Sequence, residues 1–337
     1  MKTPRTFDDV VTDSQLADEI RGGLSAVEAR LREAVKSDDA FVSEAARHLV
    51  DAGGKRFRPM VTLMAAQFGN PDAVGVVPAA VVVELTHLAT LYHDDVMDEA
   101  PLRRGAPSAN ARWDNTIAIL TGDFLFARAS DILADLGPEA VRIQARTFER
   151  LVTGQIRETV GPAEGADELA HYLDVVADKT GSLSATSGRF GAMTAGASDE
   201  IVELLTRYGE RVGVAFQLSD DILDIASDSA ESGKTPGTDL REGVSTLPML
   251  HALASTDPAG ARLRELLSGP LTDDALHAEA LALLRADPAM ERARQDLRDW
   301  ADSARAVLAP LPESTEQQQA AKAALSELCD LVITRTA

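Results

Sequence analysis

The sequence predicts an all-α protein, and three observations lead to that prediction. Apolar residues recur at three- and four-residue intervals along almost the whole chain, and no stretch alternates convincingly with a period of two. Alanine and leucine are abundant, whereas aromatic residues make up only 4% of the 337 positions, which favours helix over sheet. No shift of composition divides the chain, so we expect a single domain over residues 1–337, with a motif-bearing core at about 50–250.

The spacing of apolar residues predicts the helices in order. The segment Ser14–Ser37 is amphipathic, and the segment Asp39–Ala52 ends at Gly53–Gly54, a signal for a helix C-terminus. After a basic loop, helices are expected at about 60–69, 76–99, 113–136, 138–159, 167–189, 190–196 with a break at glycines, and 200–227. The segment Ser227–Gly243 is expected to be a loop, because it holds glycines and a proline without apolar periodicity. Beyond it, the chain is expected to be Ala/Leu-rich helix to its end.

The charge balance argues against some classes of partner. The chain carries 54 acidic and 33 basic residues, a formal net charge of −21. A surface this acidic repels phosphate backbones, so we expect no nucleic-acid partner. The single cysteine, Cys329, has no partner within the chain, and we expect neither a signal peptide nor a membrane span of about 20 clean apolar residues. These features predict a cytoplasmic protein. Against its acidic background, a local cluster of Arg and Lys is a stronger sign of a binding site than usual.

Two acidic clusters lie at the C-terminal ends of long apolar helices. They read His93-Asp94-Asp95-Val96-Met97-Asp98 and Ser219-Asp220-Asp221-Ile222-Leu223-Asp224. The three aspartates of each cluster fall within an arc of about 100° on a helix. Two like charges about 4 Å apart repel by about 4 kcal/mol at an effective dielectric of about 20, so a cation is expected to join them. Aspartate oxygens suit Mg²⁺, which completes its shell with water and substrate phosphates. A solvated helix end explains one such cluster, whereas two clusters predict a metal site with two walls.

Basic residues beside glycines supply the other half of the argument. They occur in four segments: Gly53-Gly54-Lys55-Arg56-Phe57-Arg58-Pro59, Arg103-Arg104-Gly105, Lys179-Thr180-Gly181 and Gly233-Lys234-Thr235. Arg and Lys are the side chains that bind phosphate oxygens. Each segment alone would be an ordinary solvated surface, but together with the carboxylates they predict a pocket for two polyanions, one bridged by Mg²⁺. His87 and Thr90 share the helix face of Asp94, and Gln217 shares that of Asp220.

Seven motifs follow one another over about residues 53–248. They are GGKRFRP, ELTHLATLYHDDVMD, LRRG, TGDFLFARA, KTGSL, FQLSDDILD and GKTPGTDL. In this order the sequence resembles the trans-isoprenyl diphosphate synthase (polyprenyl synthetase) family, most of all its long-chain all-trans-polyprenyl diphosphate synthases. The resemblance implies a homodimer whose subunits are single-domain helical bundles around a central apolar cavity, the isoprenoid synthase type of fold. It also implies a Mg²⁺-dependent prenyltransferase that condenses isopentenyl diphosphate head-to-tail with an allylic diphosphate, farnesyl or geranylgeranyl, with three Mg²⁺ ions per occupied site.

The resemblance also implies roles for individual residues. Asp94, Asp98 and Asp220 would ligate Mg²⁺ on the allylic diphosphate, and the acidic shell would be completed, partly through water, by Asp95, Asp221 and Asp224. Isopentenyl diphosphate would be held by Lys55, Arg58, His87 and Arg104. The allylic substrate would be contacted by Arg103, Lys179, Thr180, Gln217 and Lys234. The catalytic set would be Asp94, Asp95, Asp98, Asp220, Asp221, Arg103 and Lys179.

Product length is expected to depend on the cavity beneath the first acidic cluster. In the family that the sequence resembles, bulky aromatic residues four and five positions before this cluster give short products, and here those positions hold the small residues Thr90 and Ala89. This pattern predicts products of C30 to C50, with C35–C45 favoured and quinone side chains as the expected use. On a helix, Ala89 projects about 140° away from Asp94, so the alternative that it lines a neighbouring wall of the cavity stays open. The candidates for the tunnel floor are Phe124, Leu125 and Phe126.

Four alternatives stay open at the level of sequence. A short-chain farnesyl or geranylgeranyl diphosphate synthase (C15–C20) would also explain the motifs. A non-catalytic subunit of a heteromeric synthase would lose its acidic motifs, and both are present here. A class I terpene cyclase would carry a different second metal motif and would not need GGKRFRP. A phosphohydrolase built on His93-Asp94 would need further metal-binding histidines, and the remaining histidines show no supporting spacing.

Overall fold

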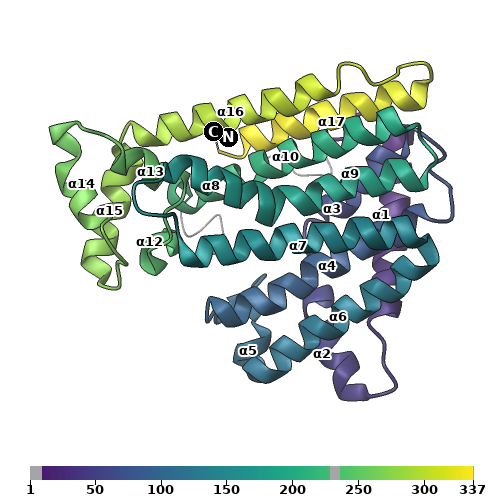
Figure 1. Cartoon of the computed structure of the whole chain (residues 1–337), viewed down its shortest axis with the longest axis horizontal. Helices are drawn as coiled ribbons and strands as arrows, with labels where there is room; N and C mark the ends of the chain where they lie inside the picture. Colours follow the sequence, from purple (N-terminus) through teal and green to yellow (C-terminus); the bar gives the residue numbers. More distant parts are fainter. Residues whose placement is uncertain (1–9, 228–235, 337) are drawn as a thin grey trace.

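The computed structural model describes residues 10–227 and 236–336, which form a bundle of helices with one short β-hairpin (Figure 1). The first half contains α1 (Ser14–Ala34), α2 (Ala40–Asp51), α3 (Phe57–Ala66), α4 (Val76–Met97), β1 (Leu102–Arg103), β2 (Ala106–Pro107), α5 (Ala109–Arg112), α6 (Asn115–Leu136) and α7 (Pro138–Val160). The second half contains α8 (Glu168–Val176), the π-helix η2 (Ala177–Gly181), α9 (Ser182–Thr194), α10 (Asp199–Ala226), α12 (Thr238–Glu242), α13 (Leu247–Leu253), the 3₁₀ turn η3 (Pro258–Gly260), α14 (Ala261–Leu266), α15 (Asp274–Ala286), α16 (Ala289–Val307) and α17 (Glu316–Thr334). The predicted all-α class is confirmed.

Aspartate N-caps define where many of these helices begin. The side chains of Asp13, Asp39, Asp114, Asp167 and Asp273 each accept a hydrogen bond from a backbone N–H in the first turn of the helix that follows. A carboxylate there satisfies an unpaired donor and interacts favourably with the helix dipole. Part of the large acidic excess of the sequence is therefore structural.

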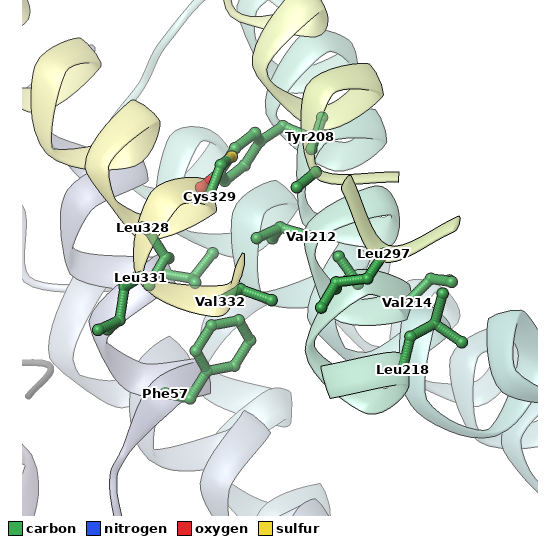
Figure 2. Close-up of a cluster of buried hydrophobic side chains, with 14 of the residues drawn as sticks. Phe57, Tyr208, Val212, Val214, Leu218, Leu297, Leu328, Cys329, Leu331 and Val332 are labelled. Carbon is green, nitrogen blue, oxygen red and sulfur yellow. The ribbon is translucent and has the colours of Figure 1, made fainter. Parts of the chain in front are cut away.

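The long helix α10 runs through the middle of the bundle and is packed against α9 and α16 (Figure 1). Figure 2 shows part of its apolar contact with the C-terminal helices: Val212 and Leu218 of α10 lie beside Leu297 of α16 and Val332 of α17. All four side chains are fully buried. A second core cluster joins α4 to α1, α2 and α6, and a third joins α4 to α7 and α9. The helices α4 and α10, which end in the two acidic clusters, are thus fixed by burial on several sides.

The structure corrects the helix boundaries predicted around residue 190. No break occurs at the glycines there, because α9 continues from Ser182 to Thr194. A Cβ atom at Gly188 would lie 2.9 Å from the carbonyl carbon of Leu205, and one at Gly191 would lie 2.9 Å from the Cβ of Ala65. These glycines therefore allow α9 to pack closely on α10 and α3, and they do not end the helix. The predicted loop at 227–243 also contains the short helix α12.

One described helix, α4, is long and apolar enough to cross a membrane. Its most apolar 18-residue window has a mean hydropathy of 1.3, and 67% of that window is buried inside the protein. The same length and composition are found in core helices, which fits the contacts of α4 with α3, α6 and α9.

Candidate active site

The first acidic motif (Asp94–Asp98) ends α4 and contains three non-equivalent carboxylates. Asp95 is fully buried, and its Oδ1 accepts a hydrogen bond from Arg103 Nε at 2.5 Å. Asp94 is partly exposed, and burial, together with the charge of Asp98, raises its pKa to about 6 despite the nearby Lys179. Asp98 is exposed, and its Oδ2 lies 3.8 Å from Arg103 Nη2. Acidic groups at a helix C-terminus oppose the helix dipole, so this motif does not serve the stability of α4.

The second acidic motif (Asp220–Asp224) repeats this arrangement near the end of α10. Asp221 is buried, and it accepts hydrogen bonds from the Tyr172 hydroxyl and from Gln217 Nε2, the latter at 2.9 Å. Burial raises the pKa of Asp221 to about 7. Asp220 and Asp224 are partly exposed, and Asp224 accepts from the backbone N–H of Thr238 at 3.3 Å. In both motifs, therefore, the middle carboxylate is held inside the protein while the outer two lie nearer its surface.

The π-helical turn η2 connects the two motifs. Lys179 donates a hydrogen bond to Glu158 at 2.6 Å, and although burial opposes its charge, Glu158, Asp94 and Asp98 together raise its pKa. The next residue, Thr180, donates to Gln217 Oε1 at 3.2 Å. One turn of chain thus interacts with the first motif through charge and with the second through Gln217. Single π turns inside α-helices are frequent at functional sites.

The charges of both motifs also act on one further carboxylate. Burial and the charges of Asp98 and Asp224 raise the pKa of Glu242 at the end of α12. Because a carboxylate of each motif acts on the same third carboxylate, the two motifs belong to one electrostatic region. Arg58 is likewise influenced by Asp220, although burial has the largest effect on its pKa.

Basic groups from three elements lie close to one another, and we call Arg56, Arg58, His87 and Arg104 the cation cluster. Burial lowers the pKa of His87 well below its usual value, and Arg58 and Arg104 lower it further. His87 is therefore neutral at pH 7 among charged arginines. The Nε atom of Arg58 is buried and has no hydrogen-bond partner in the structure. An unpaired buried guanidinium N–H favours an anionic ligand at this place.

The β-hairpin positions two of the predicted arginines. Leu102 pairs with Pro107 and Arg103 with Ala106, so the two-residue turn is Arg104-Gly105. Both turn residues have positive φ angles, 54° and 76°, as a type I′ turn requires. Arg103 is thereby directed at Asp95, whereas the guanidinium of Arg104 lies on the loop at Gly54. Gly54 has a φ of 146°, a conformation that favours glycine, and a Cβ there would also lie 2.8 Å from Arg104 Cζ. Period-two alternation did not reveal this hairpin because each strand has only two residues.

The donor chemistry of the two motifs fits Mg²⁺. All the candidate ligands are carboxylate oxygens, and the buried Oδ2 of Asp95 has no hydrogen-bond partner in the structure. Among residues 10–227 and 236–336, no three His, Cys, Asp or Glu side chains converge closely enough to hold a metal ion by themselves. Mg²⁺ usually takes only one or two protein carboxylates and adds water and substrate phosphates, so this donor set suits a metal shared with a diphosphate.

The predicted product-length residues lie on different sides of α4. Ala89 is fully buried in the core cluster shared with α1, α2 and α6, and its carbonyl oxygen would lie 3.1 Å from a Cβ at Gly122. Thr90 is partly buried and donates a hydrogen bond to the carbonyl of His87. Leu125 is fully buried in the same cluster as Ala89, and the partly buried Phe124 and Phe126 pack against it.

Sequence reasoning missed four residues that contact the site. Glu84 and Glu158 pair with Arg56 and Lys179, Tyr172 donates to Asp221, and Arg335 forms an ion pair with Asp220 at 2.6 Å. The apolar run of α4 is a signal that could have revealed Glu84, because a glutamate buried in an apolar helix needs a cation as partner. No local pattern distinguishes Arg335, which reaches the site from the end of α17. Of the predicted residues, Lys234 lies outside the described part of the chain.

The chain is similar in sequence and in structure to several known proteins. A family model described as polyprenyl synthetase matches residues 39–284. A nonaprenyl diphosphate synthase of Mycobacterium tuberculosis is 53% identical over 99% of this chain and 99% of its own length. A crystal structure of a geranylgeranyl pyrophosphate synthase from Corynebacterium glutamicum, complexed with calcium and isoprenyl diphosphate, superposes with a TM-score of 0.85 at 46% identity, covering 97% of this chain and 99% of that one. A decaprenyl diphosphate synthase from Rhodobacter capsulatus superposes with a TM-score of 0.85 at 36% identity, covering 96% and 99%.

Proposed function

The chain belongs to the polyprenyl synthetase family, and on that premise we propose that it condenses isopentenyl diphosphate with farnesyl or geranylgeranyl diphosphate to give an all-trans polyprenyl diphosphate of C30 to C50. The observation that carries the proposal is the position of η2. Lys179 is coupled to the first acidic motif, and the adjacent Thr180 is bonded to Gln217 and through it to Asp221. Two acidic motifs that can hold metal ions, together with a lysine, suit the stabilisation of a departing diphosphate.

We assign the outer carboxylates Asp94, Asp98 and Asp220 to the metal and the middle ones to positioning. Mg²⁺, three ions in the occupied site as in the family, would neutralise negative charge that develops on the departing diphosphate. Arg103 and Lys179 bind the same diphosphate and stabilise its charge when the C–O bond breaks. Asp95 holds Arg103, and Asp221 holds Gln217, so each keeps a substrate-binding group in place.

At the other end of the site, Lys55, Arg58, His87 and Arg104 hold isopentenyl diphosphate. Its double bond supplies the electron pair that forms the new C–C bond with the allylic carbon, after the allylic C–O electron pair has left with the diphosphate. Loss of a proton, with the released diphosphate as acceptor, restores a double bond and gives a product longer by five carbons. Water has to be excluded from this site during the reaction, because it would otherwise capture the allylic cation.

The long product is supported by the small residues Ala89 and Thr90 and by the similarity to the nonaprenyl diphosphate synthase. The similarity to a geranylgeranyl pyrophosphate synthase favours the shorter alternative, C20. A homodimer is supported by family membership and by exposed apolar side chains on two neighbouring helices, Leu120 on α6 and Ile156 and Val160 on α7. We place the reaction in the cytoplasm and expect its product to serve quinone side chains.

Chromatography of the reaction products tests this proposal. The purified chain, incubated alone with farnesyl diphosphate, isopentenyl diphosphate and Mg²⁺, is expected to yield C30–C50 products, and Ala89→Phe is expected to shorten them. Products of C15 or C20 alone would contradict the long-chain assignment. An unchanged distribution in Ala89→Phe would show that this residue does not line the product cavity. Absence of elongation by the lone chain would favour a subunit of a heteromeric enzyme.

A further inference from the structure

The cation cluster is arranged around one buried carboxylate, that of Glu84 on α4. The Glu84 side chain is 2% exposed, and its Oε1 accepts a hydrogen bond from Arg56 Nη1 at 2.7 Å. The same oxygen lies 3.8 Å from Arg104 Nη2. Glu84 also raises the pKa of Arg58, although burial, which lowers it, has the larger effect. Glu84 therefore faces three guanidinium groups and does not neutralise them alone, since Glu28 also pairs with Arg56.

Arg56 connects Glu84 to the loop that precedes α3. Its guanidinium donates to the backbone carbonyls of Val50 at 3.0 Å and Gly53 at 3.3 Å, and also to Glu28 of α1. The side chain of Arg56 is only 5% exposed, so it does not bind a ligand in solvent. Its contacts instead fix the backbone of residues 53–56, which contains Lys55 and leads directly to Arg58. Glu84 thus acts on that loop through Arg56.

Arg104 is also held by Glu84 and by the loop that precedes α3. Its Nη1 donates to the carbonyls of Leu49, at 3.1 Å, and Gly53, while Nη2 faces Glu84. Arg56 and Arg104 are also two of the three non-glycine residues with positive φ in the described chain, at 47° and 54°. Side chains with a Cβ avoid this conformation unless surrounding contacts impose it. The hairpin turn accounts for the φ of Arg104, and the buried contacts of Arg56 hold the φ of Arg56, so both guanidinium groups reach Glu84 from a constrained backbone.

We propose that Glu84 is a positioning residue for isopentenyl diphosphate, which orients Arg104 directly and Arg58 through Arg56 and the 53–58 loop. The inference rests on the proposed function, because it takes these cations as the isopentenyl diphosphate site. Glu84 pairs with Arg56 and Arg104, whereas the buried Nε of Arg58 has no partner and remains for the anion. If Glu84 acted only through its charge, its removal would strengthen anion binding, whereas loss of orientation weakens it. The two roles therefore predict opposite signs.

Steady-state kinetics of Glu84→Gln and Glu84→Asp distinguish the two roles. The glutamine removes the charge and keeps the length, and the aspartate keeps the charge but withdraws it by one methylene. Both variants are expected to raise the KM for isopentenyl diphosphate by about tenfold, with the KM for farnesyl diphosphate changed less than twofold. A lowered or unchanged KM for isopentenyl diphosphate in Glu84→Gln would overturn the proposal. An equal rise in both KM values would overturn it as well.

Glu158→Gln provides the matched control, because Glu158 pairs at 2.6 Å with Lys179, a residue proposed to bind the other substrate, the allylic diphosphate. Its KM for isopentenyl diphosphate is expected to stay within twofold of the wild-type value. Titration calorimetry with isopentenyl diphosphate alone measures binding without turnover, so it separates this proposal from a failure of the proposed reaction. If Glu84→Gln does not fold, Arg56→Lys tests the same link, since the three donors of one lysine nitrogen cannot replace the four contacts of the guanidinium. An unchanged affinity in Arg56→Lys would then contradict the proposal.

Discussion

At the scale of single residues, burial separates the roles of the six motif aspartates. Asp95 and Asp221 are 0% and 5% exposed and have hydrogen-bond donors inside the protein, whereas the outer four are more exposed. From the sequence, both acidic motifs are expected at one site, since carboxylates on one helix face repel unless a cation joins them. The inward turn of the middle carboxylates was not predicted, because Arg103 reaches Asp95 only through the β-hairpin and Tyr172 reaches Asp221 from α8.

The raised pKa of Asp221 predicts a pH-dependent stability of the metal-free protein. Burial raises this pKa from 3.8 to about 7, so the folded state binds a proton that the unfolded state releases between these values. The contribution of Asp221 to stability is thus complete below about pH 4 and is lost as the pH rises to about 7. Each unit of pKa shift corresponds to about 1.4 kcal/mol, so the loss amounts to a few kcal/mol.

Asp221→Asn cannot undergo this ionisation and is compared with the wild type. In urea unfolding with a chelator present, the difference in stability between the two proteins is expected to shift in favour of the variant as the pH rises from 4 to 8. Effects of the other carboxylates largely cancel in this difference. Parallel stability curves across that range would contradict the assigned burial of a carboxylate at Asp221.

At the scale of elements, glycine contacts set the distances between the helices that carry the site. A Cβ at Gly154 of α7 would lie 2.8 Å from the backbone nitrogen of Lys179, so α7 fits against η2 only without a side chain there. The sequence predicted the long amphipathic helices well, because their 3.6-residue period is strong. It did not predict the η2 π turn or the β-hairpin, which arise from packing and from two consecutive residues with positive φ angles.

Gly154→Ala is expected to displace η2 and with it Lys179. Because the clash is with backbone atoms, we expect a loss of stability of about 1–3 kcal/mol and a higher KM for farnesyl diphosphate. Gly22→Ala in α1 is the matched control, since no atom lies within 4 Å of its Cβ position. It is expected to stabilise the protein by about 0.5–1 kcal/mol. Chemical unfolding and kinetics of both variants check this prediction, and equal behaviour of the two would contradict it.

At the scale of the whole molecule, the site is assembled from segments that lie far apart in sequence. Arg56 and Arg104 meet at Glu84, η2 joins the two acidic motifs, and Arg335 of the C-terminal helix pairs with Asp220. The family motifs made most of this assembly predictable, because each places a charged residue next to a helix end or a glycine. The buried counter-charges were not predictable, since they depend on how α1, α4 and α17 pack.

The most direct test of the account is the metal dependence of elongation by the isolated chain. Incorporation of labelled isopentenyl diphosphate is measured with farnesyl diphosphate and Mg²⁺, with and without a chelator, for the wild type and for Asp94→Ala and Asp220→Ala. We expect the chelator to abolish incorporation and each substitution to lower it by at least about 100-fold, because both acidic walls act on the departing diphosphate. Elongation that persists in the chelator, or in a variant that lacks one wall, would contradict the account.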